Sequence, residues 1–155
     1  MNIGLVIYSG SGNTKSIAVK LQEKLTAAGH AVSLEEITIT GDTPAQPGKF
    51  ELKQIPAVDS YDALIFGAPV QAFSLNPVMK TYMAQLPPLN GKRVALFVTK
   101  QIPQLWLGGT GAIATLKKEV EARGGKVIGS EIVVWAEKKR AETTQKCIES
   151  ISKMF

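Results

Sequence analysis

A run of small polar residues between two regular segments constrains this chain more than any other feature. An apolar stretch, residues 3–7, comes directly before the run, and a helical pattern comes directly after it. Glycines let backbone N–H groups converge, and the N-terminus of a following helix adds partial positive charge. The run contains three hydroxyl side chains and no acidic residue, so it predicts a phosphate site. Its members are Ser9, Gly10, Ser11, Gly12, Asn13 and Thr14.

Two common phosphate-binding loops do not match this run. A P-loop requires a glycine immediately before its lysine, and Thr14 stands there before Lys15. A dinucleotide fingerprint requires a third glycine after Gly10 and Gly12, and Lys15 occupies that position. The sequence therefore favours a cradle for one phosphate group, rich in hydroxyls.

The run resembles the FMN phosphate loop of the flavodoxins, and the resemblance continues into the next helix through Ala18 and Leu21. It departs at Ile7, where many members carry an aromatic residue, and we expect Ile7 to face the core. The resemblance implies non-covalent binding of FMN, with residues 9–14 around its phosphate. It also implies that the flavin supplies the chemistry.

Composition is that of a single globular domain spanning residues 1–155. The chain has 155 residues, of which 45% are hydrophobic and 20% charged. No apolar run is long enough for a membrane span, and the N-terminus shows no leader pattern. Cys147 is the single cysteine, so no intrachain disulfide can form. These features predict a cytoplasmic protein.

The net charge of +5 bears on the choice of partner. Flavodoxins that act as electron carriers are typically acidic, so the resemblance and the charge differ here. A basic member should approach partners with an acidic face. The basic residues do not form a cluster interleaved with aromatics, so we expect no nucleic-acid partner.

Alternating strand and helix patterns predict an α/β fold, a doubly wound five-stranded parallel sheet. The phosphate loop after the first strand fits the order 2-1-3-4-5, which is the flavodoxin order. Residues 38–60 show no clear period and predict a long loop with a short helix or none. The expected strands are 3–7, 31–37, 63–66, 94–98 and 127–135, the last interrupted near Gly129, and the expected helices are 13–28, a segment from Pro77 through Leu86, 111–123 and 141–153.

Two further loops should emerge at the same sheet edge as the phosphate loop, at residues 67–76 and 99–110. By the resemblance, the first would pack along the flavin ring and the second would bind its pyrimidine end. Phe73 either stacks on the flavin or plugs the top of the core. Trp106 either contacts the flavin or covers the following helix. The residues that we assign to the ring are Ala68, Pro69, Val70, Phe73, Thr99 and Trp106.

No side chain in these loops has the character of an obligatory acid–base catalyst. His30 follows a helix stop and should be a surface residue, and Cys147 falls on the inward stripe of the last helix. The short chain and the lack of a second nucleotide motif favour an electron carrier between protein partners. The alternative is an NAD(P)H-dependent reductase of a small quinone-like acceptor, because residues 67–69 resemble a loop of flavodoxin-like quinone reductases. A third alternative is a relative that has lost flavin.

Overall fold

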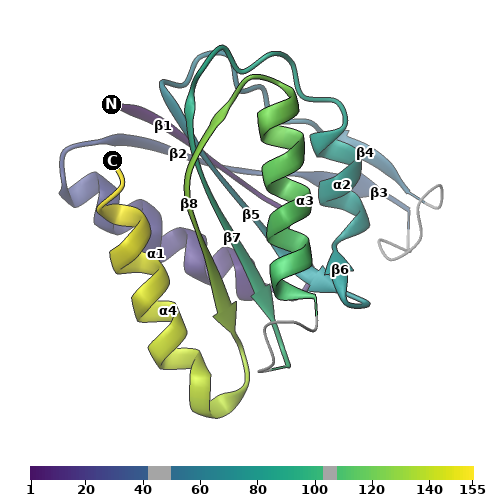
Figure 1. Ribbon diagram of the computed structural model, residues 1–155, viewed down its shortest axis with the longest axis vertical. Coiled ribbons are helices and arrows are strands. Elements are labelled where there is room, and N and C mark those ends of the chain that lie inside the picture. The colour runs from purple at the N-terminus through teal and green to yellow at the C-terminus, as the bar shows by residue number, and fades with distance from the viewer. Residues whose placement is uncertain (42–49, 103–107) are drawn as a thin grey trace.

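The computed structural model describes residues 1–41, 50–102 and 108–155. Five parallel strands form one sheet in the order β2-β1-β5-β7-β8, which confirms the predicted order 2-1-3-4-5 (Figure 1). The five strands are β1 (Asn2–Ile7), β2 (Ala31–Glu36), β5 (Ala63–Gln71), β7 (Arg93–Lys100) and β8 (Lys126–Val134). The helices are α1 (Asn13–Ala27), α2 (Pro77–Met83), α3 (Gly109–Ala122) and α4 (Glu137–Ser152).

Helices cover both faces of the sheet, α1 and α4 on one face and α2 and α3 on the other (Figure 1). The central strands are buried on both faces, as their continuous apolar runs predict. Along β5, Leu64 and Phe66 belong to the core under α2 and α3, whereas Ile65 belongs to the core under α1 and α4. Ile7 is fully buried, as expected.

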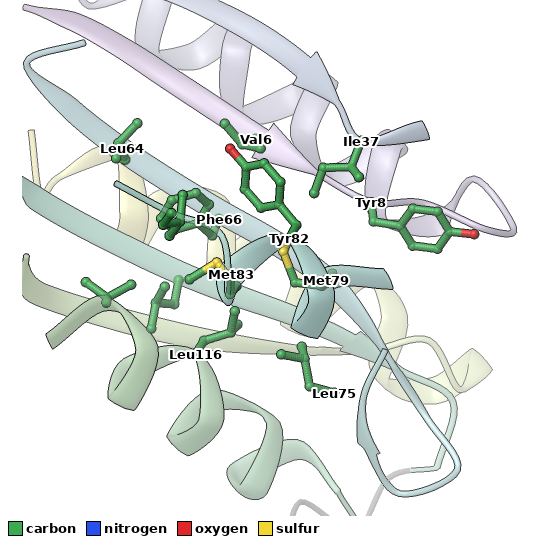
Figure 2. Close-up of a cluster of buried hydrophobic side chains, with 14 of the residues drawn as sticks. Val6, Tyr8, Ile37, Leu64, Phe66, Leu75, Met79, Tyr82, Met83 and Leu116 are labelled. Carbon is green, nitrogen blue, oxygen red and sulfur yellow. The ribbon is translucent and has the colours of Figure 1, made fainter. Parts of the chain in front are cut away.

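The core under α2 and α3 is organised around Tyr82 of α2 (Figure 2). The rings of Phe66 and Tyr82 meet edge to face, with their centroids 6.4 Å apart. The Tyr82 hydroxyl donates a hydrogen bond of 2.6 Å to the carbonyl of Pro56. Because a buried phenol requires a partner, this bond fixes residue 56 against α2.

The prediction of a long loop with a short helix or none at residues 38–60 missed two short strands. Strands β3 (Thr38–Thr40) and β4 (Glu51–Gln54) pair antiparallel in a separate two-stranded sheet. Ile39 and Leu52 pack against the core under α2 and α3. These short strands carry too few apolar residues to produce a detectable alternation in the sequence.

Several element ends also differ from the predictions. Helix α2 ends at Met83, and Leu86 is buried beyond it. Helix α4 begins at Glu137, four residues before the predicted start. Strand β8 is continuous, with an irregular register where Ala95 pairs Gly129 and Ile128 is passed over. The Asn76 side chain caps α2, because it accepts bonds from the N–H groups of Val78 and Met79.

The most consequential difference concerns strands β5 and β7. They run on to Gln71 and Lys100, well beyond the predicted ends at residues 66 and 98. Strand β6 (Ser74–Leu75) then pairs antiparallel with the end of β5. The segments predicted as loops therefore begin with strand residues, 67–71 and 99–100. No helix of the described residues is long and apolar enough to cross a membrane.

Candidate functional site

The candidate site lies at the sheet edge where β1, β5 and β7 end. The segment after β1 leads into α1, the segment after β5 turns into β6, and the segment after β7 leads toward α3. In an open parallel sheet this edge is the usual position of a ligand, at the point where the strand order reverses. Here the reversal falls between β1 and β5.

Residues 9–14 form a cradle of backbone N–H groups at the start of α1. Gly12 has a φ of 94°, a conformation that favours glycine, and an added Cβ there would meet nothing within 4 Å. The Ser9 hydroxyl accepts a hydrogen bond of 3.2 Å from the N–H of Lys15, and the Gly12 carbonyl accepts one of 3.0 Å from Ser16. Within the described part of the chain, the backbone N–H groups of residues 10–14 donate no hydrogen bond.

The cradle is open and free of acidic groups in its first helical turn. Gly10, Ser11 and Gly12 are exposed, and Asn13 is half-buried. Unpaired N–H groups at a helix N-terminus constitute an anion site, because they carry partial positive charge and lack partners. The geometry fits the phosphate group predicted for these residues.

Thr14 occupies a different position from the rest of the cradle. Only 1% of its surface is exposed, and its hydroxyl oxygen lies 2.9 Å from that of Thr99, which is also buried. One hydroxyl hydrogen serves this bond, and the second is available to another acceptor. Thr14 and Thr99 therefore connect α1 to the end of β7 and retain one donor for a ligand.

A pocket of about 210 Å³ lies between the turn after β5 and the end of β7. Its lining is mainly apolar, and the described residues that line it include no histidine or carboxylate. Phe73 is 61% exposed at its rim, so the alternative in which this ring plugs the core is wrong. The lining residues are Val70, Ala72, Phe73, Lys100, Gln101 and Ile102.

The turn that presents Phe73 is unusual. Ala72 has a φ of 50° and Phe73 a φ of 61°, although neither is glycine or asparagine. Two central residues with positive φ define the tight hairpin turn that pairs Gln71 with Ser74. Non-glycine residues in this conformation cost free energy, and such strain concentrates at ligand sites.

Gly108, the residue directly before α3, packs against the backbone of this turn. Its φ is 97°, and an added Cβ would lie 2.7 Å from the backbone of Phe73. Any other residue at this position would separate the two backbones. The glycine therefore permits direct contact between the turn after β5 and the start of α3.

The other predicted ring residues have unequal roles. Val70 lines the pocket, whereas Ala68 is fully buried in β5 and packs into the core. The Pro69 carbonyl accepts a bond from the N–H of Asn76, which stabilises the turn. Thr99 does not line the pocket; it is buried, and its hydroxyl oxygen lies 2.9 Å from that of Thr14. Trp106 lies outside the described residues.

Lys100 is one of the lining residues that the sequence interpretation did not assign, together with Ala72, Gln101 and Ile102. It ends an apolar strand, which is an unusual place for a charged residue, and only 5% of its surface is exposed. Burial lowers the pKa of its ammonium group. Lys15, which directly follows the cradle, forms an ion pair of 3.1 Å with Glu36.

Other reactive groups lie away from this edge or are inert. Cys147 is buried, and burial raises the pKa of its thiol to about 12, with the charge of Glu131 adding to the effect. His30 is half-buried beside the N-terminus, whose nitrogen lies 3.2 Å from its Nδ1. Among residues 1–41, 50–102 and 108–155, no group of three His, Cys, Asp or Glu side chains could hold a metal.

Solved structures with the same architecture are flavodoxins and related flavoproteins. A flavodoxin from Megasphaera elsdenii, solved in its two-electron reduced form, is 25% identical, with 97% of this chain and 98% of that chain covered and a TM-score of 0.68. Flavodoxin 1 from Bacillus cereus is 17% identical over 99% and 96% of the two chains, with a TM-score of 0.69. The chain has the flavodoxin-like fold.

A flavoprotein from Lactobacillus acidophilus, solved in complex with FMN, has the same flavodoxin-like fold. It is 18% identical over 94% of this chain and 97% of that one, with a TM-score of 0.64. No family model matches the sequence, and no curated protein matches it. The fold is thus recognised from structure, over nearly the full length of both chains.

Proposed function

We propose that the protein binds FMN non-covalently and carries electrons between protein partners. One observation carries this proposal. An open cradle of unpaired N–H groups, residues 10–14, and a mainly apolar pocket between β5 and β7 lie at the same edge of the sheet. A phosphate group and a flat ring are what these two features bind.

The parts of the cofactor can be assigned to residues. Ser9, Gly10, Ser11, Gly12, Asn13 and Thr14 hold the phosphate. Val70 and Phe73 contact the ring, the backbone at Ala68 and Pro69 supports it, Thr99 positions Thr14, and Trp106 completes the ring contacts. The bound flavin would supply the redox chemistry, and the protein would position it and adjust its potential.

The rim of the pocket favours a carrier over an enzyme. Phe73 is 61% exposed and Ile102 is 39% exposed, so two large apolar side chains face solvent beside the proposed ring site. Apolar groups exposed at a functional site are typical of docking surfaces. Among the described residues that line the pocket, no carboxylate or imidazole is available to transfer protons to a small substrate.

The partner should present an acidic face, because the chain has a net charge of +5. Its compartment should be the reducing cytoplasm, consistent with Cys147 as a buried single thiol. A reductase that uses NAD(P)H and a quinone-like acceptor is the competing function. A flavin-free protein is the other alternative.

Steady-state assays separate these functions. The FMN-loaded protein should oxidise NADPH negligibly by itself, with or without a quinone, and should accept electrons from a separate reductase. With an acidic partner, the rate should fall as salt is added, since screening weakens steering between opposite charges. Rapid quinone turnover that is insensitive to salt would establish the reductase instead. A colourless protein that takes up no FMN would establish the flavin-free alternative.

A further inference from the structure

A second pocket lies between α1 and α4, on the opposite face of the sheet from α2 and α3. Its volume is about 420 Å³, within the range of small-molecule sites. None of its lining residues belongs to the phosphate cradle or to the pocket between β5 and β7. Its lining includes Ile17, Lys20, Trp135, Arg140, Thr144 and Ile148.

Two cations line this pocket, and one of them is held in place. The guanidinium carbon of Arg140 lies 4.8 Å from the centre of the Trp135 ring, and its Nε donates a bond of 3.2 Å to the Trp135 carbonyl. These two contacts orient the guanidinium before any ligand arrives. Neither Arg140 nor Lys20 forms an ion pair within the described chain.

The mostly buried side chain of Thr144 adds a second, independent observation. Thr144 is only 7% exposed and makes no hydrogen bond within the described chain, although its neighbour Thr143 makes several. No fully buried side-chain oxygen or nitrogen of the described residues lacks a partner. The Thr144 hydroxyl therefore reaches the pocket that Thr144 lines, where it is available to a ligand.

The rest of the lining is apolar. Ile17 and Ile148 are nearly fully buried, and Trp135 is half-buried beside them. An apolar floor with two cations and a hydroxyl at its rim suits a ligand with an apolar body and an anionic head. We propose that this pocket binds a small organic anion, with its carboxylate or phosphate on Arg140, Lys20 and Thr144 and its body on the isoleucines.

The proposal can be tested by NMR on the full-length, isotopically labelled protein. The probe is naphthalene-2-carboxylate, and the matched control is its neutral carboxamide. The carboxylate should shift the amide signals of Ile17, Thr144 and Ile148 in a saturable way, with an affinity that saturating FMN does not change. The carboxamide, which lacks the charge, should bind at least about tenfold more weakly.

Variants locate the interaction. Arg140→Gln should raise the dissociation constant of the carboxylate at least about tenfold, whereas Lys139→Gln, on the adjacent exposed residue, should leave it unchanged. Thr144→Val keeps the shape of the side chain and should weaken binding by a smaller factor. Unchanged spectra elsewhere will show that each variant is folded.

Three results would overturn the proposal. The first is no saturable shift up to the solubility limit of the carboxylate. The second is equal binding of the carboxamide, or of the carboxylate to Arg140→Gln. The third is a set of shifts that map to residues 70–73 and disappear when FMN is added, which would place the probe in the other pocket.

Discussion

The hydroxyl oxygens of Thr14 and Thr99 lie 2.9 Å apart and join the first turn of α1 to the end of β7. Both residues are buried, at 1% and 3% exposure. This hydrogen bond connects the proposed phosphate cradle to the strand that supports the proposed ring pocket. A buried side-chain hydrogen bond therefore links the two halves of the proposed site.

Replacing one of the two threonines should destabilise the protein more than replacing both. Thr14→Val or Thr99→Val leaves one buried hydroxyl unpaired and should lower the free energy of unfolding by about 1–3 kcal/mol. The double variant removes both hydroxyls and should be close to the wild-type protein. Urea denaturation of the four proteins measures the coupling, and purely additive losses would show that the bond contributes nothing.

Gly108 and Gly111 offer a matched pair of substitutions. Gly108→Ala places a methyl group against the backbone of Phe73 at a positive φ, so it should destabilise the protein and weaken FMN binding. Gly111→Ala meets open space in helix α3 and should raise the free energy of unfolding by about 0.5–1 kcal/mol.

The measurement for this pair is thermal unfolding together with FMN titration of both variants. Equal FMN affinity for Gly108→Ala and Gly111→Ala would mean that the approach of the two backbones does not shape the ring pocket.

We expect Phe73 to lower the stability of the folded protein while it contributes a contact to the flavin ring. Its φ of 61° is strained for a phenylalanine, so Phe73→Gly should leave the free energy of unfolding unchanged or raise it by up to about 1 kcal/mol. The same change removes the proposed ring contact and should weaken FMN binding. A loss of stability with unchanged FMN affinity would reverse this assignment and make Phe73 structural.

Cys147 provides a prediction on pH. Burial raises the pKa of its thiol to about 12 in the folded protein, above the ordinary value near 8.5 that applies after unfolding. The folded state therefore keeps its proton while the unfolded state loses it, and this contribution to stability declines as the pH rises from about 8.5 to 12.

Cys147→Ala should make the alkaline loss of stability shallower. Alkylation by iodoacetamide at pH 8, measured by mass spectrometry, should be negligible in the folded protein and complete in urea. Rapid labelling without urea would contradict the buried, neutral thiol.

The order of the sheet was predicted from the resemblance of the run after β1 to a flavodoxin phosphate loop, together with the alternation of strands and helices. Strands β1, β5 and β7 contain continuous apolar runs, which located the central strands.

The parts that could not be predicted depend on contacts distant in sequence. Strand β5 extends through Pro69 to Gln71, and it does so because the later segment Ser74–Leu75 pairs with its end. The role of Thr99 requires Thr14, which is 85 positions away. Lys100 was not assigned because the sequence predicted its segment as a loop, whereas the structure shows Lys100 as the buried last residue of β7 that lines the pocket.

The central claim is that residues 9–14 bind the phosphate of FMN, and comparing FMN with riboflavin tests it most directly. The two ligands share a ring and differ by that phosphate. Isothermal titration of the flavin-free protein should show FMN binding at least about a hundredfold more tightly, since each hydrogen bond to a charged group contributes about 1.5–3 kcal/mol. The double variant Asn13→Ala, Thr14→Ala should lose most of this difference. Equal affinity of the wild-type protein for FMN and riboflavin would contradict the account.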